Sequence, residues 1–148
     1  MSVYLLDVNV LIALFDPAHV QHEAAHRWLE AHRDDSWATC PLTENGFLRI
    51  ISNPGYPSVR TTLQEARARL DDFIAASRHV FWPDDISFRD ATIFRPDRVV
   101  SSRQLTDVYL LGLCVKHQGR LATFDGRITS DAIVTSPRLV ELLAGSVG

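Results

Sequence analysis

Two short stretches decide the fold: VYLLD at residues 3–7 and LATFD at residues 121–125. In each, an aspartate directly follows a brief apolar run, which is typical of a fully buried strand. Carboxyl ends of parallel strands meet at one edge of a sheet, and ligands bind in the crevice there. Asp7 and Asp125 are therefore predicted to face one crevice. Taken singly, each could equally be a turn residue or a helix N-cap, a position that Asp favours.

Strand-like and helix-like patterns alternate along the rest of the chain. The candidate strands are Val3–Leu6, Trp37–Cys40, Val80–Trp82, Leu121–Phe124 and Ala132–Val134. The candidate helices are Val20–His32, Leu42–Ile51, Thr61–Ser77, Ile86–Phe94, Gln104–His117 and Pro137–Leu143. Such alternation predicts an α/β fold in which helices cover both faces of a mostly parallel sheet.

Composition excludes several classes of protein. The 148 residues, 46% of them hydrophobic, suffice for one globular domain. A net charge of −3 excludes a polybasic nucleic-acid binder, so an RNA partner would need a local basic patch. Cys40 and Cys114 lie far apart and support neither a disulfide framework nor a zinc ribbon. With no apolar run long enough to span a bilayer and no basic leader, we expect a cytoplasmic protein without a membrane partner.

Two further acids lie on helix faces that should point into the core. Glu44 shares a helical stripe with Phe47, Leu48 and Ile51. Asp107 shares one with Leu110, Leu111 and Cys114. A carboxylate on a core-facing stripe is costly unless it is paired or bound to a metal.

If the four acids converge, a cation must lie among them. Two carboxylates about 4 Å apart repel by roughly 4 kcal/mol at an effective dielectric constant of about 20. Ligands that are all oxygen favour Mg²⁺ or Mn²⁺ over zinc. Such an ion polarises phosphoryl oxygens and lowers the pKa of a bound water. The chemistry predicted from these residues is phosphodiester hydrolysis.

Four segments resemble the PIN-domain ribonucleases, specifically the VapC toxins of bacterial toxin-antitoxin systems. They are LLDVNVLI (residues 5–12), TENGFLRI (residues 43–50), LTDVYLL (residues 105–111) and ATFD (residues 122–125). The resemblance runs from Leu5 to about Val134 and implies a single PIN domain over residues 1–148. It also implies a PIN-like three-layer α/β/α sandwich with a mostly parallel sheet of about five strands.

The resemblance further implies a function and a site. The family's metal-binding and catalytic quartet matches Asp7, Glu44, Asp107 and Asp125, with Mg²⁺ or Mn²⁺ as cofactor. The implied activity is that of a metal-dependent endoribonuclease, the toxin of its pair. The implied partners are an RNA substrate, a VapB-type antitoxin whose C-terminal segment covers the acidic crevice, and a second copy of this chain.

The resemblance also suggests a role for Asn9 and Thr123, as groups that orient the carboxylates of Asp7 and Asp125 or the waters of the metal. Local hydrogen bonding in turns is an equally good interpretation of both residues.

The motif H-E-x-x-H at His22, Glu23 and His26 favours a different class, a zinc metallopeptidase. On a helix, however, these histidines share the wet side, opposite Ala24, Ala25 and other apolar residues, so we expect them to face water. The sequence offers no third ligand in the longer metzincin pattern.

A third alternative is a module that binds RNA without cutting it. Arg49, Arg103, Arg120 and Arg127 neighbour the proposed acids in sequence and could position phosphates. A phospho-acceptor receiver domain is excluded, because it needs a lysine at the end of a late strand and Lys116 lies within a predicted helix.

Overall fold

The computed structural model describes residues 2–58, 60–135 and 138–145, and over these residues five strands form one parallel sheet. The strands are β1 (Val3–Leu6), β2 (Ser36–Thr39), β3 (His79–Phe81), β4 (Arg120–Thr123) and β5 (Val140–Leu142). They lie in the order β3-β2-β1-β4-β5. Because this order reverses at β1, the ligand crevice expected for such a sheet lies at the carboxyl ends of β1 and its neighbours.

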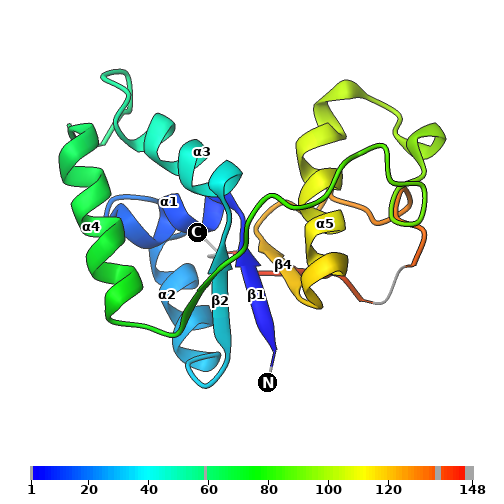
Figure 1. The fold of residues 1–148 in the computed structure, drawn as a ribbon. Coiled ribbons are helices and arrows are strands. Elements are labelled where there is room, and N and C mark those ends of the chain that lie inside the picture. Colours follow the sequence, from blue (N-terminus) through cyan, green and yellow to red (C-terminus); the bar gives the residue numbers. More distant parts are fainter. Residues whose placement is uncertain (1, 59, 136–137, 146–148) are drawn as a thin grey trace.

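Helices cover both faces of the sheet, which confirms the predicted α/β/α sandwich. The helices of the described residues are α1 (Val8–Phe15), α2 (His22–Ala31), α3 (Pro41–Ile51), α4 (Leu63–Ala75) and α5 (Leu105–His117). Figure 1 shows α1 to α4 on one side of the sheet and α5 on the other. Two short 3₁₀ turns, Pro96–Arg98 and Ser102–Gln104, precede α5.

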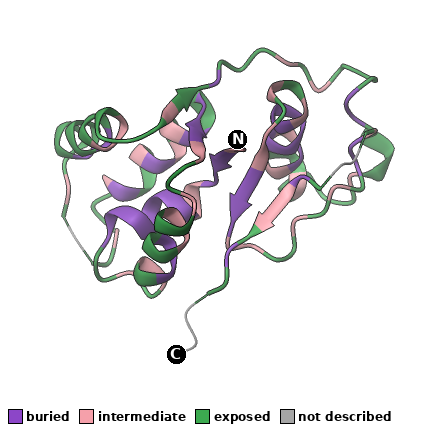
Figure 2. Cartoon of the chain, turned by 90° about the horizontal axis from the view of Figure 1, so that it is seen from below, coloured by how far each residue is buried: buried purple, intermediate pink, exposed green. Residues whose placement is uncertain are grey.

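Strand β1 separates two hydrophobic clusters. Tyr4 and Leu6 pack with residues of α1 to α4, whereas Leu5 packs with Trp82 and the buried face of α5. In Figure 2 the buried residues lie along the sheet and the helix faces turned toward it. A strand buried on both faces reads as a continuous apolar run, which is why β1 is predicted correctly from its sequence.

Helix α1 lacks the amphipathic pattern by which the other helices are predicted, and it is missing from the sequence-based prediction. Its residues from Val10 to Phe15 are all buried, so apolar side chains occur around the whole helix. Asp7 is its N-cap, since the Val8 N–H donates to Asp7 Oδ1 at 2.8 Å. The first predicted site residue therefore also begins a helix.

The predicted helix over Ile86–Phe94 is wrong. This segment forms turns, in which Ser87 Oγ accepts from the Arg89 N–H and Asp90 Oδ1 accepts from the Thr92 N–H. Side chains of Ser and Asp compete in this way with helical hydrogen bonds.

The predicted elements near the end of the chain are also wrong. Ala132–Val134 is not a strand of the sheet; Ile133 forms an isolated antiparallel bridge with Phe94. The helix predicted over Pro137–Leu143 is replaced, within the described residues, by strand β5, while Pro137 lies outside those residues. Both segments are apolar because they bury side chains against the second cluster and β4, and burial alone does not distinguish a strand from a loop or a short helix.

Candidate active site

Asp7 lies between strand β1 and helix α1 and is 9% exposed. Its Oδ1 accepts from the Val8 N–H, and its Oδ2 accepts from the Thr123 hydroxyl at 2.8 Å. Its backbone N–H continues the β1–β4 pairing by donating to the Ala122 carbonyl at 3.0 Å. Burial raises the pKa of Asp7 despite these hydrogen bonds, and the negative charge of Asp125 raises it further.

Asp107 lies in the first turn of α5 and is half-buried. Burial raises its pKa from 3.8 to about 6, with further contributions from the charges of Asp7 and Asp125. Arg127 offsets part of this shift. The three carboxylates therefore interact through their charges, although they come from distant parts of the chain.

Asp125 follows strand β4 and is paired with an arginine. Its Oδ1 accepts from the backbone N–H and the Nε of Arg127 at 2.9 and 3.0 Å, and its Oδ2 accepts from Nη2 at 3.2 Å. These bonds from Arg127 lower the pKa of Asp125. Arg127 therefore favours the charged form of Asp125, whereas burial disfavours the charged forms of Asp7 and Asp107.

Glu44 joins the same edge of the sheet through strand β2. It lies in the first turn of α3, half-buried, and accepts from the hydroxyl of Thr39 at 2.6 Å. Thr39 in turn accepts from Nε2 of His79 at 2.7 Å, a ring whose pKa burial lowers. Thr39 is the last residue of β2, so Glu44 lies at the carboxyl end of that strand, one strand away from Asp7.

A glycine brings α3 close to α1. A Cβ atom on Gly46 would lie only 2.9 Å from a methyl group of Val8, so a larger residue there would require either the Val8 side chain or helix α3 to shift. Neither Gly46 nor Thr39 is identified by the sequence analysis, since nothing in their spacing indicates these contacts.

One hydroxyl connects the segments that carry two of the acids. Thr123 is 0% exposed; it donates to Asp7 and accepts from the Asp125 N–H at 3.1 Å and from Asn9 Nδ2 at 3.2 Å. Asn9 Oδ1 accepts from the Phe124 N–H at 3.3 Å. Thr123 and Asn9 therefore make contacts that orient Asp7 and the backbone at Asp125.

The donor set suits a hard divalent cation in its chemistry. Carboxylate oxygens are the preferred ligands of Mg²⁺ and Mn²⁺, and the raised pKa values of Asp7 and Asp107 indicate negative charge that lacks full compensation. As the side chains stand, no group of three or more His, Cys, Asp or Glu among the described residues is arranged to hold a metal ion. Asp125 in particular would have to exchange Arg127 for the ion.

The structure separates the four arginines that neighbour the acids in sequence. Arg103 and Arg127 line a cavity together with Asp107 and Asp125. Arg120 does not: it begins β4, at the end of the sheet away from the acids, and lines a different cavity. Arg49 is exposed in the last turn of α3.

The H-E-x-x-H motif has a structural use. His22 Nδ1 donates to the carbonyl of Ala13 at 2.8 Å, and His26 Nε2 donates to that of Leu14 at 2.9 Å. His26 is exposed and His22 is half-buried, so both rings lie on the wet side of the helix as expected, and in addition they satisfy carbonyls in the last turn of α1. The described residues supply no third ligand beside them.

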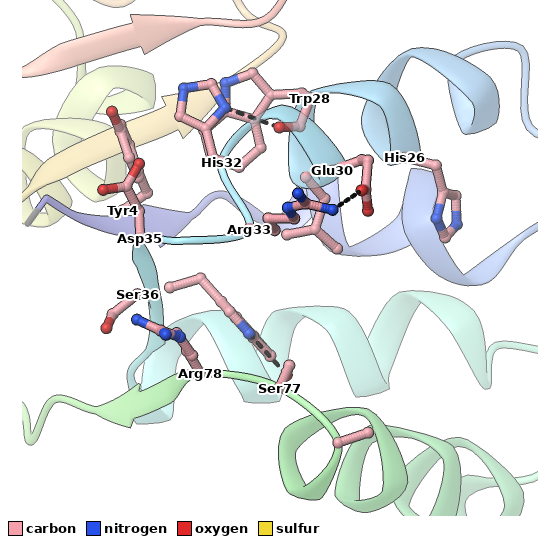
Figure 3. A pocket seen from close by; sticks show the side chains of 13 residues that line it. Tyr4, His26, Trp28, Glu30, His32, Arg33, Asp35, Ser36, Ser77 and Arg78 are labelled. Atoms are coloured by element: carbon pink, nitrogen blue, oxygen red, sulfur yellow. Dashed lines mark hydrogen bonds and ion pairs between the residues drawn. The ribbon is translucent and has the colours of Figure 1, made fainter.

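A second hollow lies at the opposite end of the sheet, near the start of β1 and β2. Figure 3 shows Tyr4, Trp28 and His32 along one side, with Arg33 paired to Glu30 at 3.1 Å. None of the four acids lines it. This hollow is therefore separate from the candidate active site.

Comparison with known proteins identifies relatives along nearly the whole chain. Residues 4–133 match the model of the PIN domain family. The chain is 43% identical over 139 residues to Ribonuclease VapC39 of Mycobacterium tuberculosis strain H37Rv, covering 94% of this chain and 98% of that protein. It is 42% identical over 133 residues to Ribonuclease VapC44 of the same strain, covering 87% of this chain and 90% of that protein.

A solved structure shares the fold. VapBC2 from Rickettsia felis, bound to a DNA fragment from its promoter, superposes with a TM-score of 0.61 at 11% sequence identity. The match covers 96% of this chain and 99% of the other.

Among the described residues, no helix is long and apolar enough to cross a membrane.

Proposed function

The chain belongs to the VapC ribonucleases of the PIN-domain family, and from this premise we propose that it is a metal-dependent endoribonuclease, the toxin of a toxin-antitoxin pair. The observation that carries the proposal is the charge-coupled group of Asp7, Asp107 and Asp125, with the pKa of Asp107 raised to about 6. Perturbed carboxylates at the carboxyl edge of a parallel sheet are typical of active sites.

We assign the metal-binding and catalytic roles to Asp7, Glu44, Asp107 and Asp125. When bound, Mg²⁺ or Mn²⁺ would neutralise the scissile phosphate and make the attacking water more acidic. Asp7 supplies a carboxylate fixed from both sides, by Val8 and Thr123. Glu44 supplies one fixed by Thr39.

Asp107 is accessible to a substrate, because it is half-buried in the first turn of α5 and lines the cavity that also contains Asp125. Burial and the charges of Asp7 and Asp125 raise its pKa in the ion-free protein. A bound cation would favour its charged form, so we assign Asp107 to the metal rather than to proton transfer.

The proposed partners are RNA, a VapB-type antitoxin that covers the acidic crevice, and a second copy of the chain, all within the cytoplasm. We also propose a single PIN domain over residues 1–148. Strand β5 lies beyond the matched residues 4–133, yet it pairs with β4 from Leu121 to Thr123, which supports one continuous domain.

The direct test is cleavage of total RNA by the purified protein, free of antitoxin, with Mg²⁺ or Mn²⁺ and then with EDTA. We expect cleavage that EDTA stops. Cleavage unaffected by EDTA would reject the metal mechanism, and binding of RNA without cleavage would favour the non-cleaving module. Zinc-dependent peptide hydrolysis that is lost in His22→Ala would instead establish the peptidase.

A further inference from the structure

We propose that Arg98, Arg103 and Arg127 form a phosphate subsite that holds the RNA backbone beside the scissile bond, an inference that rests on the proposed ribonuclease function. The three arginines line one cavity of about 440 Å³. Asp107 and Asp125 line the same cavity, so it opens directly onto the candidate active site.

The cavity is built by two segments that meet above the carboxyl ends of the strands. One runs from Arg98 to the first turn of α5, and the other runs from Asp125 to Ala132. An RNA strand lying in this cavity would pass from the acids toward the 3₁₀ turns before α5. The fold thus offers a direction for the RNA, away from the sheet edge and along the arginines.

Two of the arginines carry uncompensated charge. Arg98 and Arg103 are exposed, and within the described part of the chain neither guanidinium pairs with a carboxylate. Some arginines elsewhere are paired with a carboxylate, as in Arg33 with Glu30, and others are not, so what distinguishes Arg98 and Arg103 is their place in the cavity beside Asp107 and Asp125. One further acid, the exposed Asp131, also lines the cavity and leaves these two guanidinium groups unpaired. Free guanidinium groups beside a hydrolytic site match the phosphates that flank a scissile bond.

Arg127 has a partner that a phosphate can replace. Its side chain is 92% exposed and holds both oxygens of Asp125 through Nε and Nη2. A phosphate presents the same pair of oxygens to an arginine fork. Once another cation neutralises Asp125, Arg127 can turn from the carboxylate to the RNA backbone without leaving the cavity.

The same cavity also has an apolar wall. Val100 is 90% exposed and, with the half-buried Ile128, lies beside the arginines. These aliphatic side chains can contact the sugars, whereas the arginines bind phosphate oxygens. The ligand chemistry that fits the cavity is therefore the sugar-phosphate backbone of RNA.

The test measures RNA binding separately from cleavage. In the Asp7→Asn background, a short labelled single-stranded RNA of mixed sequence is titrated by fluorescence anisotropy at several salt concentrations with Mn²⁺ present. Adding Arg98→Ala and Arg103→Ala should weaken binding by about tenfold to a hundredfold. The slope of log K against log salt should fall by about 1.4, or about 0.7 for each phosphate that is no longer neutralised. In the otherwise wild-type enzyme, the same pair should raise KM more than it lowers kcat.

The matched control is Arg33→Ala with Arg78→Ala, which removes two arginines from the hollow at the other end of the sheet. It should leave RNA affinity and the salt slope unchanged. Equal losses in both double variants would overturn the subsite, because they would reflect overall charge. Unchanged RNA affinity with weaker binding of the antitoxin would also overturn it and assign the arginines to that partner. If the wild-type protein binds RNA through these arginines but cuts none, the proposed function fails and the arginines remain only as an RNA-binding site.

Discussion

The two ends of the parallel sheet carry hollows of equal volume, about 440 Å³ each, yet they treat charge differently. At the amino ends of the strands, Arg33 and Glu30, which line the hollow, form an ion pair at 3.1 Å. At the carboxyl ends, burial and repulsion among the carboxylates raise the pKa of Asp7 and that of Asp107. Charge that the fold itself leaves uncompensated marks the end where a cation and a phosphate belong.

The largest expected effect is on RNA cleavage, which substitutions at the carboxyl end of the sheet should abolish and substitutions at the amino end should not. Asp7→Asn and Asp107→Asn should each lower RNA cleavage by at least about a hundredfold, because each removes a carboxylate from the reacting centre. Asn retains the N-cap of α1, so the loss in Asp7→Asn should not come from unfolding. The matched control, Glu30→Gln at the amino end, should cleave like the wild type. Full activity in either Asp variant would remove that residue from the site.

A second comparison removes one hydroxyl group at each end of the sheet, that of Thr123 at the carboxyl end and that of Ser77 at the amino end. Thr123→Val keeps the shape of the side chain but leaves Asp7, the Asp125 N–H and Asn9 without their shared partner. We expect a loss of about 2 kcal/mol in the free energy of unfolding and about tenfold in cleavage rate. Thr123→Ser should restore both.

The counterpart at the amino end is Ser77→Ala, which removes the acceptor of Trp37 Nε1 at 2.9 Å. It should cost stability, by about 1 kcal/mol, without slowing cleavage. If Thr123→Val behaves in the same way, Thr123 only supports the fold.

A smaller effect concerns the arginine on Asp125. Arg127→Ala removes a competing cation from that carboxylate, so Mn²⁺ should bind a few-fold more tightly and the pKa of Asp125 should rise toward its ordinary value. Calorimetric titration with Mn²⁺ measures the first effect. Arg33→Ala should change nothing, and weaker Mn²⁺ binding in Arg127→Ala would mean that Arg127 supports the ligand geometry instead.

The last prediction concerns how the free energy of unfolding depends on pH. Because the pKa of Asp107 is raised from 3.8 to about 6 in the folded protein, its contribution to stability is present below pH 3.8 and is lost as pH rises through about 6. Denaturant unfolding should therefore show Asp107→Asn gaining on the wild type by about 1 kcal/mol between about pH 4 and about pH 7, after allowance for solvent screening. A difference that does not vary with pH would show that Asp107 is not strained by its neighbours.

The parts of the fold that follow from local pattern are predicted well from sequence. Strand β1 is a continuous apolar run followed directly by Asp7, β4 contains the buried Leu121 and Ala122 shortly before Asp125, and α5 follows its helical spacing. Helix α1 is missed because burial on all sides removes its periodicity. Strand β5 is missed because three residues at the sheet edge carry too little pattern, and its pairing with β4 is a tertiary contact.

In the candidate site, likewise, some residues follow from local sequence and others only from the folded structure. The four acids can be selected from strand ends and helix faces. Their hydrogen-bond partners, however, depend on the register in which the strands pair. Pairing of Leu6 with Ala122 brings Thr123 beside Asp7, and no local spacing indicates that the two are neighbours. Arg98 is likewise absent from the sequence prediction, because it lies nine residues before Asp107 and only the path of the chain through the 3₁₀ turns brings it into the cavity.

The most direct test of the central claim, that the carboxyl edge is a cation site, is the thermal stability of matched variants with and without Mn²⁺. The wild type should gain about 2.7 kcal/mol in stability at a concentration about 100 times the dissociation constant. Asp7→Asn and Asp107→Asn should be at least as stable as the wild type without metal and should gain much less with it. Asp71→Asn, an exposed acid on α4, should match the wild type in both conditions. If Asp107→Asn is strongly destabilised without metal and keeps the full gain with it, Asp107 is a structural residue and does not contribute to a cation site.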